Sequence, residues 1–214
     1  SLFTCHQNIC EEVRNVFNFI EYSFKHYDFK YLQVSPFNNR RKIRALINRE
    51  IHAAKSGRKA VISLKLNNLV DDSIIRQLYA ASQAGVKIRM IVRGMCALKP
   101  GIKGLSENIS IISIVDRFLE HPRCLVFHNG GDPEVYLSSA DWMTRNLDYR
   151  LEVGVPILDA TLKKRVIDIL EIQFSDRCKA RVIDEQQSNS YVKRGNKKKV
   201  RSQMAIYDYL KKLK

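Results

Sequence analysis

A strand, a helix and a second strand follow one another without interruption between residues 60 and 92. Residues 60–66 form an apolar, β-rich run; Asp71 opens a helical pattern, which Gly85 ends before a second apolar run at 86–92. Crossovers of this kind are right-handed and join parallel strands. The succession predicts an α/β fold with a mixed, largely parallel central sheet flanked by helices, whose ligands gather at the carboxyl ends of the strands.

Further periodic segments extend this pattern on both sides. Asp159 is a typical helix N-cap, and the Asn-Gly-Gly-Asp sequence beginning at Asn129 is typical of a hairpin turn. Helical spacing is found at 8–24, 40–55 and 159–174, and short β-rich runs at 31–34, 109–115, 124–127, 134–137 and 151–155. A chain of 214 residues can bury one substantial core. We therefore expect one domain over residues 1–190, with a basic helical extension over 191–214 packed on it.

The charge balance points to a polyanionic partner. The 37 Lys and Arg residues outnumber the 22 Asp and Glu residues, which gives a formal net charge of +15. Nucleic acid, an anionic membrane and polyphosphate all fit that charge. Nucleic-acid readers usually interleave aromatic side chains with basic ones, and the basic run at 193–201 contains none. We expect no nucleic-acid partner.

Cysteine usage and hydropathy bear on location. The five cysteines are scattered without a C-x-x-C pair, which fits neither a disulfide framework nor a zinc knuckle. No apolar run approaches the roughly 18 residues that a membrane span requires. The sequence predicts a soluble cytoplasmic protein, with peripheral membrane association as the alternative.

Arg93 and His121 are the leading candidates for phosphoryl chemistry. Arg93 follows an apolar run and precedes Gly94, so it is aimed at the ligand edge of the sheet. A histidine such as His121 can accept, donate or covalently hold a phosphoryl group, and Arg123 could pair with the same oxyanion. The alternative is that Glu120 or a carbonyl holds His121 merely to complete a loop.

Other candidates surround these residues. We expect Asp141, in S-S-A-D, to orient a basic side chain rather than contact an anion. Lys65 and Arg150 are predicted phosphate contacts; solvent exposure of Lys65 and a rim salt bridge for Arg150 are the alternatives. No metal-ligating cluster, P-loop or G-x-G-x-x-G motif is present, so side chains and strand ends must hold any nucleotide phosphates.

Several long motifs resemble the C-terminal part of the bacterial polyphosphate kinase family. They are V-R-G-M-C at 92–96, D-R-F-L-E-H at 116–121, V-Y-L-S-S-A-D-W-M-T-R-N at 135–146 and R-G-N-K-K-K-V-R-S-Q at 194–203. The resemblance implies reversible transfer of the terminal phosphate of ATP to inorganic polyphosphate, through a phosphohistidine and with Mg²⁺ that arrives with the nucleotide or is bound by other domains. It also implies two paired phospholipase D-like domains, of which this chain is the second.

Residue by residue, the resemblance assigns His121 as the second-domain histidine at the ATP site and Arg93 as a nucleotide-phosphate contact. Arg150 matches a further phosphate contact. The predicted site is therefore catalytic His121, with Arg93, His121, Arg150, Arg123 and Lys65 binding ATP phosphates and no metal ligand. The implied partners are ATP or ADP, polyphosphate and the remaining kinase domains, in a homo-oligomer when full length.

Two departures qualify the resemblance. Phospholipase D enzymes place lysine two residues after the histidine and aspartate five residues later; here Arg123 and His128 occupy those positions. No segment matches the surroundings of the family's autophosphorylated histidine, so the chain alone is predicted to transfer no phosphate. The alternative functions are a phospholipase D-type phosphodiesterase and a non-catalytic polyanion-binding module.

Overall fold

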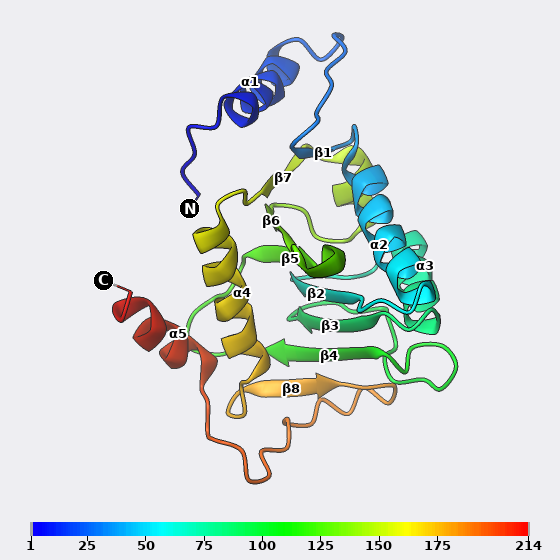
Figure 1. Cartoon of the computed structure of the whole chain (residues 1–214), viewed down its shortest axis with the longest axis vertical. Coiled ribbons are helices and arrows are strands. Elements are labelled where there is room, and N and C mark those ends of the chain that lie inside the picture. Colours follow the sequence, from blue (N-terminus) through cyan, green and yellow to red (C-terminus); the bar gives the residue numbers. More distant parts are fainter. Residues whose placement is uncertain (1, 214) are drawn as a thin grey trace.

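An eight-stranded mixed sheet forms the centre of the molecule in a computed structural model that describes residues 2–213 (Figure 1). Neighbouring strands lie in the order β1-β7-β6-β5-β2-β3-β4-β8. The strands are β1 (Gln33–Ser35), β2 (Val61–Leu66), β3 (Lys87–Val92), β4 (Ile109–Ile114), β5 (Arg123–Phe127), β6 (Glu134–Ser138), β7 (Glu152–Pro156) and β8 (Ala180–Ile183). The helices are α1 (Gln7–Glu21), α2 (Asn39–Lys55), α3 (Asp72–Gln83), α4 (Ala160–Phe174) and α5 (Ser202–Lys211).

The predicted crossover from β2 through α3 to β3 is confirmed. Asp71 caps α3 by accepting a hydrogen bond from the Ile74 backbone N–H at 3.0 Å, and β2 and β3 pair in parallel. The prediction that the sheet is largely parallel is wrong. Within the described residues only β2 with β3 and β3 with β4 are parallel. The hairpin turn between β5 and β6 is too short for a crossover, so their pairing is antiparallel, and β8, absent from our predictions, returns antiparallel to β4.

Helices α2 and α3 cover one face of the sheet (Figure 1). Ile62, Leu64 and Leu66 alternate along β2 toward this face and are fully buried against apolar residues of both helices. Trp142, which follows β6, belongs to the same cluster. This packing fixes the strand ends from which the candidate site residues project.

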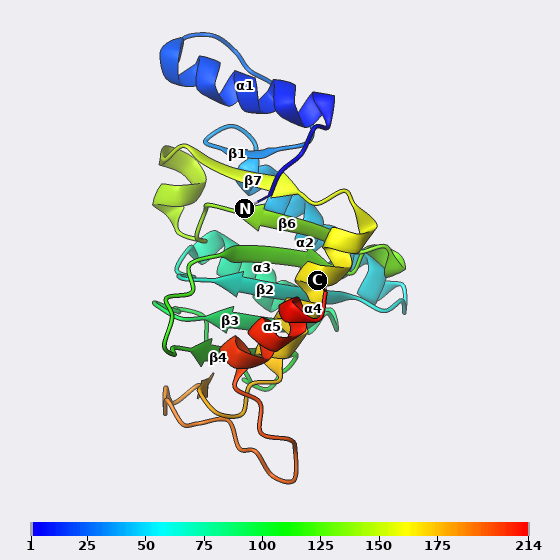
Figure 2. The same ribbon diagram turned by 90° about the vertical axis from the view of Figure 1, so that its left-hand side faces the viewer.

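Helices α4 and α5 cover the other face. Cys124 and Val126 of β5 pack there against Leu170 of α4. Tyr209 of α5 donates a hydrogen bond to Asp168 of α4 at 2.8 Å, which joins the two helices. Figure 2 shows α5 alongside α4, with the segment before it looping beyond the edge of the sheet.

The C-terminal segment contacts the sheet as well as α4. The Val192 backbone N–H donates to the carbonyl of Ala180 in β8 at 2.9 Å. A division of the chain at residue 190 stays a prediction.

The N-terminal helix lies at the end of the molecule beyond β1. The buried Glu12 carboxylate anchors it by accepting hydrogen bonds from the backbone N–H groups of Lys30 and Leu32, each at 2.7 Å. Phe17 and Ile20, on the outer side of α1, are 66% and 63% exposed. None of the helices in residues 2–213 combines the length and apolar character needed to cross a bilayer.

Candidate active site

Four chain segments bring their polar residues to one edge of the sheet. Asn67 follows β2 and Arg93 follows β3, and these strands are parallel, so both residues lie at the same edge. Because β5 runs antiparallel to β2, its beginning lies at that edge too, with His121 just before it. Asp141 follows the end of β6, the neighbour of β5. The topology therefore gathers these four residues.

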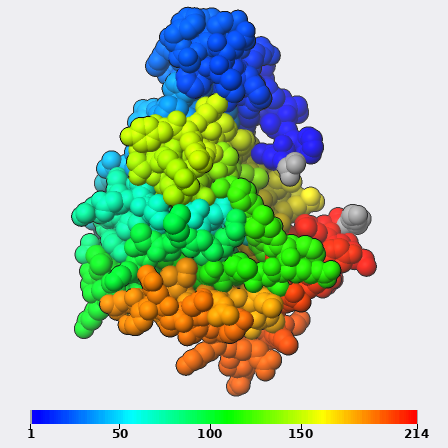
Figure 3. Space-filling view, turned by 180° about the vertical axis from the view of Figure 1, so that it is seen from behind, coloured from blue at the N-terminus to red at the C-terminus, as the bar shows by residue number. Residues whose placement is uncertain are grey.

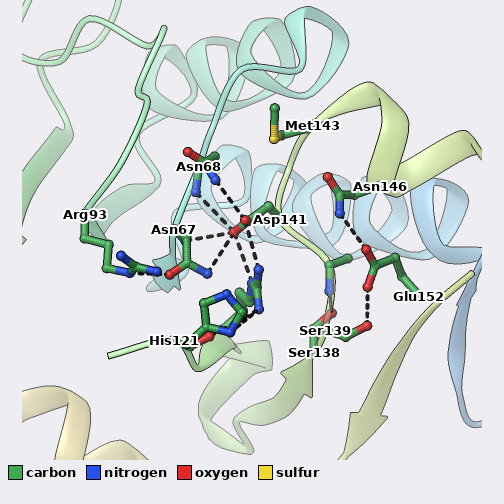
Figure 4. A network of polar contacts seen from close by, with 12 residues as sticks. Asn67, Asn68, Arg93, His121, Ser138, Ser139, Asp141, Met143, Asn146 and Glu152 are labelled. Carbon is green, nitrogen blue, oxygen red and sulfur yellow. Dashed lines mark hydrogen bonds and ion pairs between the residues drawn. The ribbon is translucent and has the colours of Figure 1, made fainter. Parts of the chain in front are cut away.

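The carboxylate of Asp141 is the centre of the resulting network (Figure 4). Its Oδ1 accepts hydrogen bonds from the backbone N–H groups of Asn67 at 2.8 Å and Asn68 at 3.1 Å. Arg123 donates to both oxygens, from Nε at 3.2 Å and from Nη2 at 3.0 Å. The prediction that Asp141 orients a basic side chain is confirmed.

The environment of Asp141 keeps this carboxyl ionised. Burial alone would raise its pKa, but hydrogen bonds from Arg123, from the Asn68 side chain and from the backbone outweigh burial and hold the pKa below the usual value. A permanently charged Asp141 is a fixed anchor for the guanidinium of Arg123.

Arg123 in turn holds His121. Its Nη1 lies 3.2 Å from Nδ1 of the imidazole and also 3.2 Å from the His121 carbonyl oxygen. A guanidinium only donates, so Nδ1 must accept, and the proton of the neutral imidazole is then on Nε2. The imidazole is exposed and presents an N–H donor away from Arg123. The Glu120 carboxylate is paired with Lys65, Gln173 and Gln203 and not with the imidazole, so the alternative that Glu120 holds the His121 side chain is wrong.

Arg93 joins the same network through Asn67. The Nε of Arg93 donates to Oδ1 of Asn67, whose Nδ2 donates to Asp141 at 3.4 Å. Within residues 2–213, neither Nη1 nor Nη2 of Arg93 takes part in a hydrogen bond. Asn67, Asp141 and Arg123 thus connect Arg93 to His121 and leave one edge of its guanidinium available for an anion.

Gly94 lets the turn after β3 approach the segment after β2. A Cβ atom at this position would lie 2.7 Å from Oδ1 of Asn68 and 2.8 Å from the Asn67 carbonyl oxygen. The Gly94 N–H donates to that carbonyl at 2.8 Å. The residue is glycine because the two strand ends are too close for a side chain.

Lys65 faces the α4 side and is buried. Its ammonium forms an ion pair with Glu120, which also accepts hydrogen bonds from Gln173 of α4 and from Gln203 of α5. Burial lowers the pKa of Lys65, and the charge of Glu120 opposes that shift. The predicted phosphate contact of Lys65 stays a prediction, because in this structure Glu120 is its partner.

Arg150 lies at the same edge but outside the network. It precedes β7, whose beginning adjoins the end of β6, and its side chain is exposed. Within the described residues Arg150 forms no ion pair, which goes against the alternative of a rim salt bridge; its phosphate contact stays a prediction. The structure therefore brings Arg93, Arg123 and His121 into one network and places Arg150 nearby.

Metal ligation by this network is poorly supported. Nowhere in residues 2–213 do three His, Cys, Asp or Glu side chains come together as potential metal ligands. Both oxygens of Asp141 are occupied by amide and guanidinium donors. These residues do not fit a Mg²⁺ site.

Comparison with known proteins decides the family. Residues 32–203 match the family described as polyphosphate kinase C-terminal domain 2. The chain belongs to the polyphosphate kinase family. It is 62% identical over 213 residues to the polyphosphate kinase of Vibrio parahaemolyticus, covering 100% of this chain and 31% of that protein.

Solved structures agree with this placement. The polyphosphate kinase of Porphyromonas gingivalis superposes with a TM-score of 0.95 at 45% identity, over 98% of this chain and 32% of that one. A phospholipase D family member, Nuc from Salmonella typhimurium, gives a TM-score of 0.50 at 14% identity over 72% of this chain and 96% of its own. The second likeness supports the phospholipase D-like fold alone. The chain spans about 31% of the length of the curated relative.

Proposed function

We propose that this chain supplies the nucleotide-phosphate side of a polyphosphate kinase active site. The whole enzyme would move the terminal phosphate of ATP reversibly to inorganic polyphosphate, through a phosphohistidine carried outside this chain. The observation that supports the proposal is the network that joins His121 to Arg93 at one sheet edge, in a chain whose relatives are named polyphosphate kinases.

In the first step, a histidine nitrogen elsewhere in the enzyme attacks the γ-phosphorus. A nitrogen–phosphorus bond forms while the bond to the β,γ-bridging oxygen breaks, and ADP leaves with the electron pair. Arg93 would neutralise non-bridging oxygens with its unoccupied Nη groups, and His121 would donate a hydrogen bond from Nε2 to an opposing oxygen. In the second step, a terminal oxygen of polyphosphate takes the phosphoryl group and releases the histidine.

The remaining predicted ligands take different parts in this proposal. Arg150, exposed at the same edge, would contact a phosphate directly. Arg123 is already engaged, because Nε and Nη2 donate to Asp141 and Nη1 contacts Nδ1 and the carbonyl oxygen of His121, so its main role would be to set the position of His121. Mg²⁺ would add Lewis-acid neutralisation of the triphosphate when it is bound with the nucleotide.

The phosphodiesterase alternative fits the residues less well. Arg123 occupies the position of the phospholipase D lysine, but two of its nitrogens are engaged by Asp141. His128 occupies the aspartate position at the far end of β5 from His121. Hydrolysis of a simple phosphodiester by the chain would favour this alternative over the kinase.

The proposal is tested in the complete natural polypeptide that contains this sequence. We expect His121→Ala and Arg93→Ala each to lower ATP-dependent polyphosphate synthesis by ~10³-fold or more, because each removes a contact to the transferred phosphoryl group. His128→Ala and Arg58→Ala, outside the network, are matched controls and should retain activity. Turnover at the wild-type rate in either site variant would refute the assignment.

The isolated chain provides a second test. When residues 1–214 are incubated with radiolabelled ATP and Mg²⁺, we expect neither phosphohistidine nor polymer to form, since the nucleophile would lie elsewhere. Label retained on the chain through an acid-labile bond would contradict the proposal that the nucleophilic histidine lies outside this chain.

We further propose that the complete enzyme is cytoplasmic and homo-oligomeric.

A further inference from the structure

A second cluster of cations lines an open groove beside the first turn of α5. The groove has a volume of about 700 Å³ and lies between the α4–β8 turn and the segment that enters α5. Its ten lining residues include one carboxylate, Asp208. Five of them are basic: Arg177, Lys179, Lys198, Lys199 and Arg201.

Most of these charges are not neutralised. Arg201 is paired with Asp116 at 2.7 Å, and Arg177 donates from Nη1 to two backbone carbonyls. Within residues 2–213, Lys179, Lys198 and Lys199 take part in no ion pair. The backbone N–H of Ser202 at the start of α5 is already bound by Asp176, so the charge available to a ligand comes from the three lysine side chains. The groove therefore carries a net positive potential that an extended anion would relieve.

The walls of the groove are held in place by Asp176. This fully buried carboxylate accepts hydrogen bonds from the backbone N–H groups of Lys179 at 2.7 Å and Ser202 at 2.7 Å. Burial would raise its pKa, but these backbone hydrogen bonds outweigh burial and lower it. The turn that carries Lys179 and the beginning of α5 thus form one rigid unit.

The groove is connected to the candidate active site by a short loop. Arg201 holds Asp116 at the beginning of that loop, and Gln203 holds Phe118 and Glu120 further along it. His121 comes next, five residues after Asp116, so roughly 17 Å of extended chain is the upper limit on their separation. In Figure 3 the chain from β8 toward α5, drawn in orange, lies at the end of the molecule opposite α1.

We propose that this groove binds the polyphosphate chain at a distance from its reacting end. The inference rests on the proposed function and extends it to a second contact with the same substrate. Lysine ammonium groups act as mobile point charges, which suits a flexible polymer with a charge on every unit. No aromatic side chain lines the groove to stack a base, so a nucleic acid is the less favoured occupant.

The test compares two sets of charge removals in the complete polypeptide. One set is Lys179→Gln, Lys198→Gln and Lys199→Gln. The control set is Lys55→Gln, Arg58→Gln and Lys59→Gln. It removes the same charge from exposed residues that precede β2, at the sheet edge opposite the candidate active site. Equilibrium binding of long and short polyphosphate, single-stranded DNA and ATP is measured over a salt series, alongside turnover.

We expect the groove set to weaken long-chain polyphosphate binding by ~10-fold and to make it less steeply salt-dependent. Short-chain polyphosphate and ATP should bind as in the wild type. An equal loss in the control set, an unchanged long-chain affinity, a loss confined to DNA, or a loss that includes ATP would overturn the proposal. Failure of wild-type turnover would instead refute the kinase function, because polymer binding is measured without catalysis.

Discussion

Two carboxylates hold the region of His121, one from each side. Asp141 acts through Arg123, which contacts the imidazole, whereas Glu120 is the preceding residue and holds the loop itself. The partners of Asp141 belong to strand ends and are fixed by the sheet. Glu120 depends on Gln173 of α4 and Gln203 of α5, so its position depends on how those helices pack.

This difference shows that the strand ends hold one side of the site, whereas the packing of α4 and α5 holds the other. Contacts to Asp141 involve segments directly after β2 and at the start of β5, which are neighbours in the sheet and need no contact from α4 or α5. Contacts to Glu120 are complete only when α5 has docked. Changes at α5 should therefore reach the imidazole through Glu120, while the Asp141 side stays intact.

The largest expected effect concerns the Glu120 side. Lys65→Met removes the cation from a pair whose side chains are only 6% and 15% exposed and leaves Glu120 without its counter-charge. We expect the free energy of unfolding of residues 1–214 to fall by about 3 kcal/mol. Urea unfolding followed by circular dichroism measures it.

The double variant Lys65→Met with Glu120→Gln is the matched control. It removes both charges, so more than half of the lost stability should return. A single variant as stable as the wild type would show that the pair does not hold the loop.

The sequence predicted the Asp141 side far better than the Glu120 side. Strand ends follow from periodicity, so Arg93, His121 and Asp141 could be placed at one edge of the sheet. A carboxylate at that edge predicts that Asp141 orients a basic side chain. The contacts of Lys65 could not be predicted, because nothing in its neighbourhood indicates that Gln203, 138 residues later, completes them. Strand β8 was missed for a related reason: it is short and follows a helix, and its pairing with β4 depends on tertiary packing.

A smaller effect is expected on the Asp141 side. Arg123→Lys keeps the positive charge but cannot contact both oxygens of Asp141 and Nδ1 of His121 at once. In the complete enzyme we expect kcat to fall by ~10²-fold with little change in KM for ATP, because the imidazole is misplaced and not lost. Arg165→Lys, on the exposed face of α4, is the control. An unchanged kcat would show that Arg123 does not position His121.

The turn after β3 allows a finer test of the same side. A methyl group at Gly94 would meet both Asn68 and the Asn67 carbonyl, so the segment holding Arg93 must shift. We expect Gly94→Ala to lower the free energy of unfolding by about 1–3 kcal/mol, with a parallel loss of turnover. Met95→Ala, at the adjacent exposed residue, should be neutral in both measurements. Wild-type stability of Gly94→Ala would mean that the two strand ends can separate without cost.

Acid should reveal the charge on Asp141 with the smallest effect of all. Its pKa is lower in the folded chain than in the unfolded chain, so the stability it contributes is fully present above the unfolded value near 4 and is lost as the pH falls through the folded value. Asp141→Asn should lower the free energy of unfolding at pH 7. Between pH 5 and pH 3, however, the free energy of unfolding should fall less in this variant than in the wild type. Asp132→Asn, at an exposed carboxylate, is the matched control and should keep the wild-type slope. Identical slopes for Asp141→Asn and the wild type would show that hydrogen bonds from Arg123 and Asn68 do not favour the ionised carboxylate.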